Sequence, residues 1–68
     1  MTPWQRVHKK FGLTSAGLAR LIGRDRSKVS RALKDEKGLI SGRDQELIIS
    51  AAKQVGADVR PEDMLPGA

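Results

Sequence analysis

The side chains best suited to binding chemistry are the basic and hydroxyl residues of one short segment, residues 26–34. A helix over this segment turns its apolar side chains to one face, at about 100° per residue. That face holds Val29, Ala32 and Leu33. The opposite face and its shoulders hold Ser27, Lys28, Ser30, Arg31 and Lys34. Because arginine can pair with guanine through two hydrogen bonds and serine can bind several base edges, the pattern predicts a helix that reads the DNA major groove.

Position on this face predicts a role for each side chain. We expect Arg31, which points outward, to be the main base reader, and Lys28 on a shoulder to reach a base or a phosphate. The base readers expected from this face are Ser27, Lys28, Ser30 and Arg31. The alternative is an ordinary solvated helix face.

The residue types that catalysis and metal binding need are scarce in this chain. It has one histidine, His8, and no cysteine, and its carboxylates are not clustered. General acid–base catalysis and metal ligation depend on such groups. We therefore expect no enzyme activity, no metal and no cofactor, and we expect His8 to be a half-buried side chain with satisfied hydrogen bonds.

Charge is unevenly distributed along the chain. Up to Lys34 there are nine basic residues against one acid, and from Asp35 onward there are four against seven. A basic half in a chain too apolar to be disordered indicates a surface for a polyanion, with nucleic acid as the first candidate. Solubilising charge without a partner is the alternative.

Length and composition predict a single domain over residues 1–68, since independently folding units run roughly 50–200 residues. The absence of cysteine suits a reducing cytosol. It also means that packing or self-association must stabilise a core this small. No apolar run approaches the roughly 18–20 residues of a membrane span, and no signal-type stretch follows the basic start. We expect a cytoplasmic protein with no membrane contact and no small-molecule ligand.

Capping residues and glycines divide the chain into four or five short helices. The expected helix starts are Thr2-Pro3, Thr14 or Ser15, Asp25 and Ser41, and the expected ends are Gly12, Gly23, Gly38 and Gly56. The fourth helix is predicted over about residues 42–55, with Asp44 in a capping box, and a short last helix over about 61–65. Trp4 and Phe11 share a face of the first helix and are predicted to be core, not a base-stacking platform. With no β-type alternation, the fold class is all-α.

Residues 15–34 have the spacing of two short helices that meet at a steep angle. Such a pair needs a small residue where the backbones approach, a glycine in the turn and an apolar residue that returns to the core. This framework is filled by Leu18, Ala19, Ile22, Gly23 and Val29. On these residues the segment resembles the helix-turn-helix of the phage Cro and lambda-repressor-like family.

The resemblance extends, through the number and length of the helices, over about fifty-five residues. The chain departs from the family at Ser15, where glutamine is usual, and at Ala32, where a larger hydrophobe is common. Residues 61–66 resemble the ends of small prophage Cro-like proteins in which helices replace β-strands. The resemblance implies a lambda-repressor-like domain that binds double-stranded DNA. It also implies that Arg26, near the start of the third helix, projects toward the groove, which makes it the fifth predicted base reader.

The helix starts on both sides of the reading helix are expected to bind DNA phosphates, because free backbone N–H groups and the positive dipole end meet there. In the resembling family, the start of the fourth helix lies against the DNA backbone. The predicted phosphate-binding set is Thr14, Ser15, Lys34, Ser41, Gly42 and Arg43. Arg24 is placed in the turn with no contact assigned, and Asp25 is a helix cap.

Self-association is expected because readers of this kind bind two half-sites about 34 Å apart as a dimer. The candidate dimer patch is Ile40, Ile49, Met64 and Leu65. The alternative is that these side chains cover the core of the single chain.

Together these patterns predict a sequence-specific regulator that binds operator DNA as a homodimer, a Cro-type repressor of phage or prophage origin. An activator or an antitoxin-like autorepressor with the same fold remains open, because these differ in operator position and partner. A protein–protein adapter on the same scaffold is a further alternative. It would carry apolar residues on the outward face of the third helix, where this chain is basic and polar.

Overall fold

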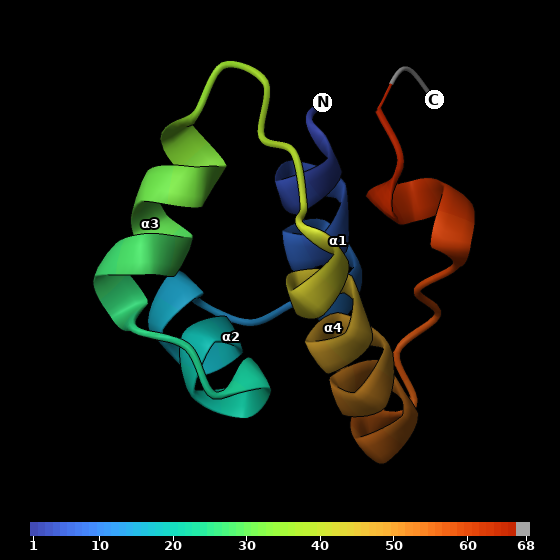
Figure 1. Ribbon diagram of the computed structural model, residues 1–68. Helices are drawn as coiled ribbons and strands as arrows, with labels where there is room; N and C mark the ends of the chain where they lie inside the picture. Colours follow the sequence, from blue (N-terminus) through green and yellow to red (C-terminus); the bar gives the residue numbers. More distant parts are fainter. Residues whose placement is uncertain (67–68) are drawn as a thin grey trace.

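A computed structural model of the protein describes residues 1–66. These residues form four α-helices and one short 3-10 helix and contain no strand (Figure 1). The elements are α1 (Pro3–Phe11), α2 (Ser15–Ile22), α3 (Arg26–Lys34), α4 (Gly42–Val55) and η1 (Pro61–Met64). The predicted all-α class is confirmed. Figure 1 shows α3 and η1 on opposite sides of α1 and α4.

The helix boundaries follow the predicted capping signals. A side-chain oxygen at each N-cap accepts a hydrogen bond from a backbone N–H in the first turn, and the N-caps of the four α-helices are Thr2, Thr14, Asp25 and Ser41. Left-handed glycines follow α1, α2 and α4, at Gly12, Gly23 and Gly56. Since these contacts join residues two or three apart, local sequence was enough to predict them.

The segment after α3 packs against the start of α1. The helix ends at Lys34, so Gly38 closes the following loop rather than the helix itself. Gly38 adopts a φ of 53°, and a Cβ there would overlap the side chain of Thr2. Its carbonyl accepts from the backbone N–H of Trp4 at 3.2 Å, and the Trp4 indole Nε1 donates to the carbonyl of Leu39 at 3.1 Å. These bonds hold the α3–α4 loop against the start of α1.

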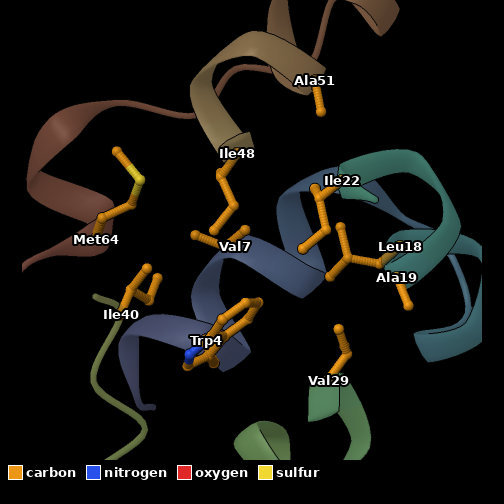
Figure 2. Close-up of a cluster of buried hydrophobic side chains, with 10 residues drawn as sticks. All are labelled: Trp4, Val7, Leu18, Ala19, Ile22, Val29, Ile40, Ile48, Ala51 and Met64. Atoms are coloured by element: carbon orange, nitrogen blue, oxygen red, sulfur yellow. The ribbon is translucent and has the colours of Figure 1, made fainter. Parts of the chain in front are cut away.

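One apolar core joins all five elements and the α3–α4 loop. Figure 2 shows its buried members, which are Trp4, Val7, Leu18, Ala19, Ile22, Val29, Ile40, Ile48, Ala51 and Met64. Trp4 is core, as predicted, and Phe11 packs partly buried against the cluster. Val55 lies in the last turn of α4 and is exposed.

The proposed dimer patch does not exist as an exposed surface. Ile40 and Met64 lie together at one side of the core in Figure 2, with 7% and 1% of their surface exposed. Ile49 is partly buried against the same core, and only Leu65 is exposed. The patch is therefore a wrong prediction for Ile40 and Met64. The physical reason is that a chain this short must use its tail to cover its own core.

Arg6 fastens that tail to α1. Its guanidinium donates to the carbonyls of Asp63 at 3.1 Å, Met1 at 3.0 Å and Leu65 at 2.6 Å. The tail forms a 3-10 helix, in which the N–H of Asp63 donates to the carbonyl of Arg60 three residues earlier, and not an α-helical turn. Arg6, which the sequence offered only as positive charge, is a structural residue.

Candidate nucleic-acid interface

The α2–α3 pair has the predicted framework. Leu18, Ala19, Ile22 and Val29 are all buried, and Ala19 is 1% exposed where the two helices pack together. Gly23 adopts a φ of 75° in the turn, and the N–H of Arg24 donates to the carbonyl of Ala19 at 2.9 Å. A small residue and a left-handed glycine thus let α3 leave α2 sharply and project from the fold.

An open groove lies between the first turn of α2 and the outer face of α3. Its lining residues are Thr14, Ser15, Ala16, Arg26, Ser27, Ser30 and Arg31. The structure therefore brings together four of the five predicted base-reading side chains and two of the predicted phosphate-binding residues. The lining is polar and basic apart from one alanine. A groove of this composition can bind an anionic chain along α2 while offering donors and acceptors from α3.

Arg31 lies along the outward face of α3. Its Nε donates to the carbonyl of Ser27, one turn earlier, at 3.3 Å, and both residues are exposed. This bond uses one of the five N–H donors of the guanidinium. The remaining guanidinium donors have no hydrogen-bond partner among residues 1–66, and Arg31 is one of the residues that line the groove.

Lys28 points away from this groove, although it is on the same helix. Its Nζ lies 3.5 Å from Oδ2 of Asp44 at the start of α4. It lines a second hollow, between α3, the α3–α4 loop and α4, with Trp4, Arg31, Ala32, Asp35, Leu39, Ser41 and Asp44. Lys28 is therefore absent from the α2–α3 groove, and of the other predicted base readers only Arg31 lines this second hollow as well.

Asp44 is the centre of a buried polar cluster. It is 2% exposed, and its Oδ1 accepts from Nε of Arg24 at 2.7 Å while its Oδ2 accepts from Oγ of Ser41 at 3.1 Å. Burial raises the pKa of Asp44, but the hydrogen bonds from Arg24 and Ser41 and the charges of Lys28 and Arg24 outweigh burial. The pKa is lowered from its ordinary 3.8, so the carboxylate is ionised at neutral pH.

The start of α4 keeps free backbone donors. The hydroxyl of Ser41 is occupied, because it accepts from the N–H of Asp44 at 3.3 Å and donates to that carboxylate. The first intrahelical bond of α4 runs from Gln45 to the carbonyl of Ser41, so the N–H groups of Gly42 and Arg43 precede it. Gly42 and Arg43 are exposed. They remain candidates for an anion, whereas the Ser41 side chain serves the cap.

Lys34 is not brought into the groove. It ends α3 and lines a hollow on another part of the surface, together with Met1, Thr2, Pro3, Gln5, Asp35, Glu36, Lys37 and Pro66. It is exposed and has no ion pair among residues 1–66. Lys34 therefore lies at the C-terminal end of α3, outside the groove at its N-terminal half.

The buried role of Asp44 was missed, although its signal was present. Asp44 precedes Ile48 by four residues and Ala51 by seven, which places it on the buried stripe of α4. A carboxylate on such a stripe needs cationic partners. Its partners, Arg24 and Lys28, come from other elements, and no local spacing indicates them.

His8 is half-buried, as predicted, but one of its ring nitrogens lacks the expected hydrogen bond. Its Nε2 is buried and has no hydrogen-bond partner in the described part of the chain. Residues 1–66 hold no group of three potential metal ligands. None of their helices has both the length and the apolar character that crossing a membrane requires.

The fold and this surface define a small all-α domain that presents one helix of a helix-turn-helix pair beside a basic groove. Comparison with family models, with curated proteins and with solved structures found no match to this chain. Its function is therefore inferred from the geometry of its own residues.

Proposed function

We propose that this protein is a sequence-specific, double-stranded DNA-binding regulator that places α3 in the major groove. The observation that carries the proposal is the groove that joins the start of α2 to Arg26, Ser27, Ser30 and Arg31 of α3. The particular function proposed is that of a Cro-type repressor of phage or prophage origin, which occupies an operator and excludes polymerase.

The start of α2 supports this arrangement. The side chain of Thr14 accepts from the N–H of Gly17 at 3.0 Å, and the first intrahelical bond runs from Leu18 to the carbonyl of Thr14. The N–H groups of Ser15 and Ala16 are thus left for an external acceptor at the positive end of the helix. A DNA phosphate there would align α3 with the base edges without itself reading sequence.

The base readers have the chemistry that specificity needs. Arg31 and Arg26 can each bind guanine O6 and N7 through two hydrogen bonds, and Ser27 and Ser30 can accept from or donate to base edges. Gly42 and Arg43 would contact phosphate at the α4 side. Two copies on a palindromic site, as a homodimer formed on DNA, would double this contact set.

Selection of sites from a random duplex library, followed by titration of the enriched site and a scrambled duplex at two salt concentrations, tests the proposal. We expect enrichment of a short palindromic site and a tight, salt-sensitive complex. No enriched motif, together with weak binding that vanishes at physiological salt, would overturn it and direct the search to a protein partner.

A further inference from the structure

Four cationic side chains lie in the α2–α3 turn or along α3 up to its second turn, and they are Arg24, Arg26, Lys28 and Arg31. Two of them form ion pairs within the protein. Arg24 and Lys28 both contact the carboxylate of Asp44, at 2.7 and 3.5 Å. Arg26 and Arg31 have no ion pair within residues 1–66 and line the open groove. The positive charge near the reading helix is therefore divided into a held pair and a free pair.

The held pair resists release because its anion is buried. Side-chain exposure is 3% for Asp44, compared with 27% for Arg24 and 42% for Lys28. A phosphate that captured Lys28 or Arg24 would leave the buried carboxylate with fewer partners, and an uncompensated buried charge is unfavourable. The exposed guanidinium groups of Arg26 and Arg31 carry no such penalty.

We propose that Asp44 is a specificity-determining, positioning residue, which limits nonspecific DNA binding by holding Arg24 and Lys28 on the protein. The inference rests on the proposed DNA-binding function. Nonspecific affinity grows with each phosphate that a cation neutralises, whereas sequence is read by base contacts. Holding two cations back lowers nonspecific binding and leaves the base readers Arg26 and Arg31 unchanged, so the ratio of specific to nonspecific affinity rises.

The first test replaces the charge of Asp44 and keeps its shape. In Asp44→Asn, the released cations become available to any duplex. We expect tighter binding to a scrambled duplex and a steeper dependence of log K on log salt, by about 0.9 for each cation that gains a phosphate. The ratio of specific to nonspecific affinity should fall. Circular dichroism establishes that the variant is folded.

Glu46→Gln is the matched control. Glu46 is also on α4 and exposed, it has no ion pair among residues 1–66, and its substitution changes the net charge by the same amount. We expect its salt dependence to equal that of the wild type. A general gain in affinity from lost negative charge would appear in both variants, whereas release of held cations appears only in Asp44→Asn.

The second test begins with a variant that leaves Asp44 intact, so its first measurement does not depend on the stability of Asp44→Asn. Lys28→Met should leave the nonspecific salt slope unchanged, because the lysine is held. In the double variant Asp44→Asn with Lys28→Met, the slope should return toward the wild-type value by about 0.9 relative to Asp44→Asn alone.

Two results would overturn the inference about Asp44 alone, and a third would overturn the proposed DNA-binding function as well. A Lys28→Met slope shallower by about 0.9 would show that Lys28 already contacts phosphate, and it would overturn the inference. The inference is also overturned if the folded Asp44→Asn variant shows the same dependence of log K on log salt as Glu46→Gln. If the wild-type protein binds no duplex at all, the proposed function itself is overturned, and the inference falls with it.

Discussion

Arg24 and Arg26 are two positions apart in the chain, but the fold uses them differently. Arg24 donates to Asp44 at 2.7 Å, whereas Arg26 is exposed in the groove beside α2. The same contrast separates Lys28, which faces α4, from Arg31, which lies on the outer face of α3. Neighbouring cations of the same type thus divide into structural and ligand-facing groups, and the position of one buried carboxylate decides the division.

Removing the structural arginine should have the largest effect on stability. Arg24→Ala leaves Asp44 buried with only Lys28 as a charged partner, and breaking a buried pair costs about 3 kcal/mol or more of unfolding free energy. Urea denaturation measures this loss. In the matched variant Arg26→Ala, we expect a change within about 0.5 kcal/mol, because the side chain is exposed. Equal stabilities of the two variants would contradict the division.

Overpacking the interface between α2 and α3 should cause the next largest loss of stability. Ala19 is buried where α2 and α3 pack together, so Ala19→Leu forces the helices apart and should destabilise the fold by about 1–3 kcal/mol. For a domain of this size, that lowers the melting temperature by roughly 4–8 °C per kcal/mol. Arg20→Leu, on the exposed side of the same helix, is the control. An unchanged melting temperature in Ala19→Leu would mean that the interface between α2 and α3 can accommodate a larger side chain without strain.

A base reader should affect binding and not stability. Arg31→Ala should lose about 1–3 kcal/mol of binding free energy on the selected site and much less on a scrambled duplex. Fluorescence anisotropy titrations on both duplexes measure the difference. Lys28→Ala should change the preference for the selected site less than Arg31→Ala does. Equal losses on both duplexes would remove the base-reading role of Arg31 and leave it as a phosphate contact.

The pH dependence of stability should show the smallest effect. Because the pKa of Asp44 is lower in the folded state than its ordinary 3.8, its ionised form stabilises the fold fully above about pH 4. That contribution is lost as the pH falls through the lower, folded-state pKa. Urea denaturation at pH 7 and pH 3 should show a smaller acid loss for Asp44→Asn than for the wild type. Equal losses in the two proteins would mean that Asp44 contributes nothing to acid sensitivity.

Most of the α2–α3 groove was predictable because it depends on one helix and its cap. Ser27, Ser30 and Arg31 follow from the period of an α-helix whose apolar face is marked by Val29, and Arg26 was expected there from the family resemblance. The structure places all four in the groove. Lys28 follows the same period, but its ion pair with Asp44 of α4 holds its side chain outside the groove.

The apolar residues outside helices were harder to place. Ile40 lies in a loop and Met64 in a short 3-10 turn, and neither has a periodic pattern that assigns it a face. Their burial depends on how the loop and the tail return to α1, through the bonds of Trp4 and Arg6. For this reason a surface patch and a core contribution could not be told apart from spacing alone.

The sequence by itself determined the local structure: the capped helices, the glycine ends, the Ala19 and Gly23 framework and the outward polar face of α3. These depend on hydrogen bonds and side-chain periods that span a few residues. Only the tertiary structure decided which cations face a ligand and which are held. Arg24 and Asp44 are 20 residues apart, and their ion pair exists because the core packs α2 against α4 and brings the start of α4 to the α2–α3 turn.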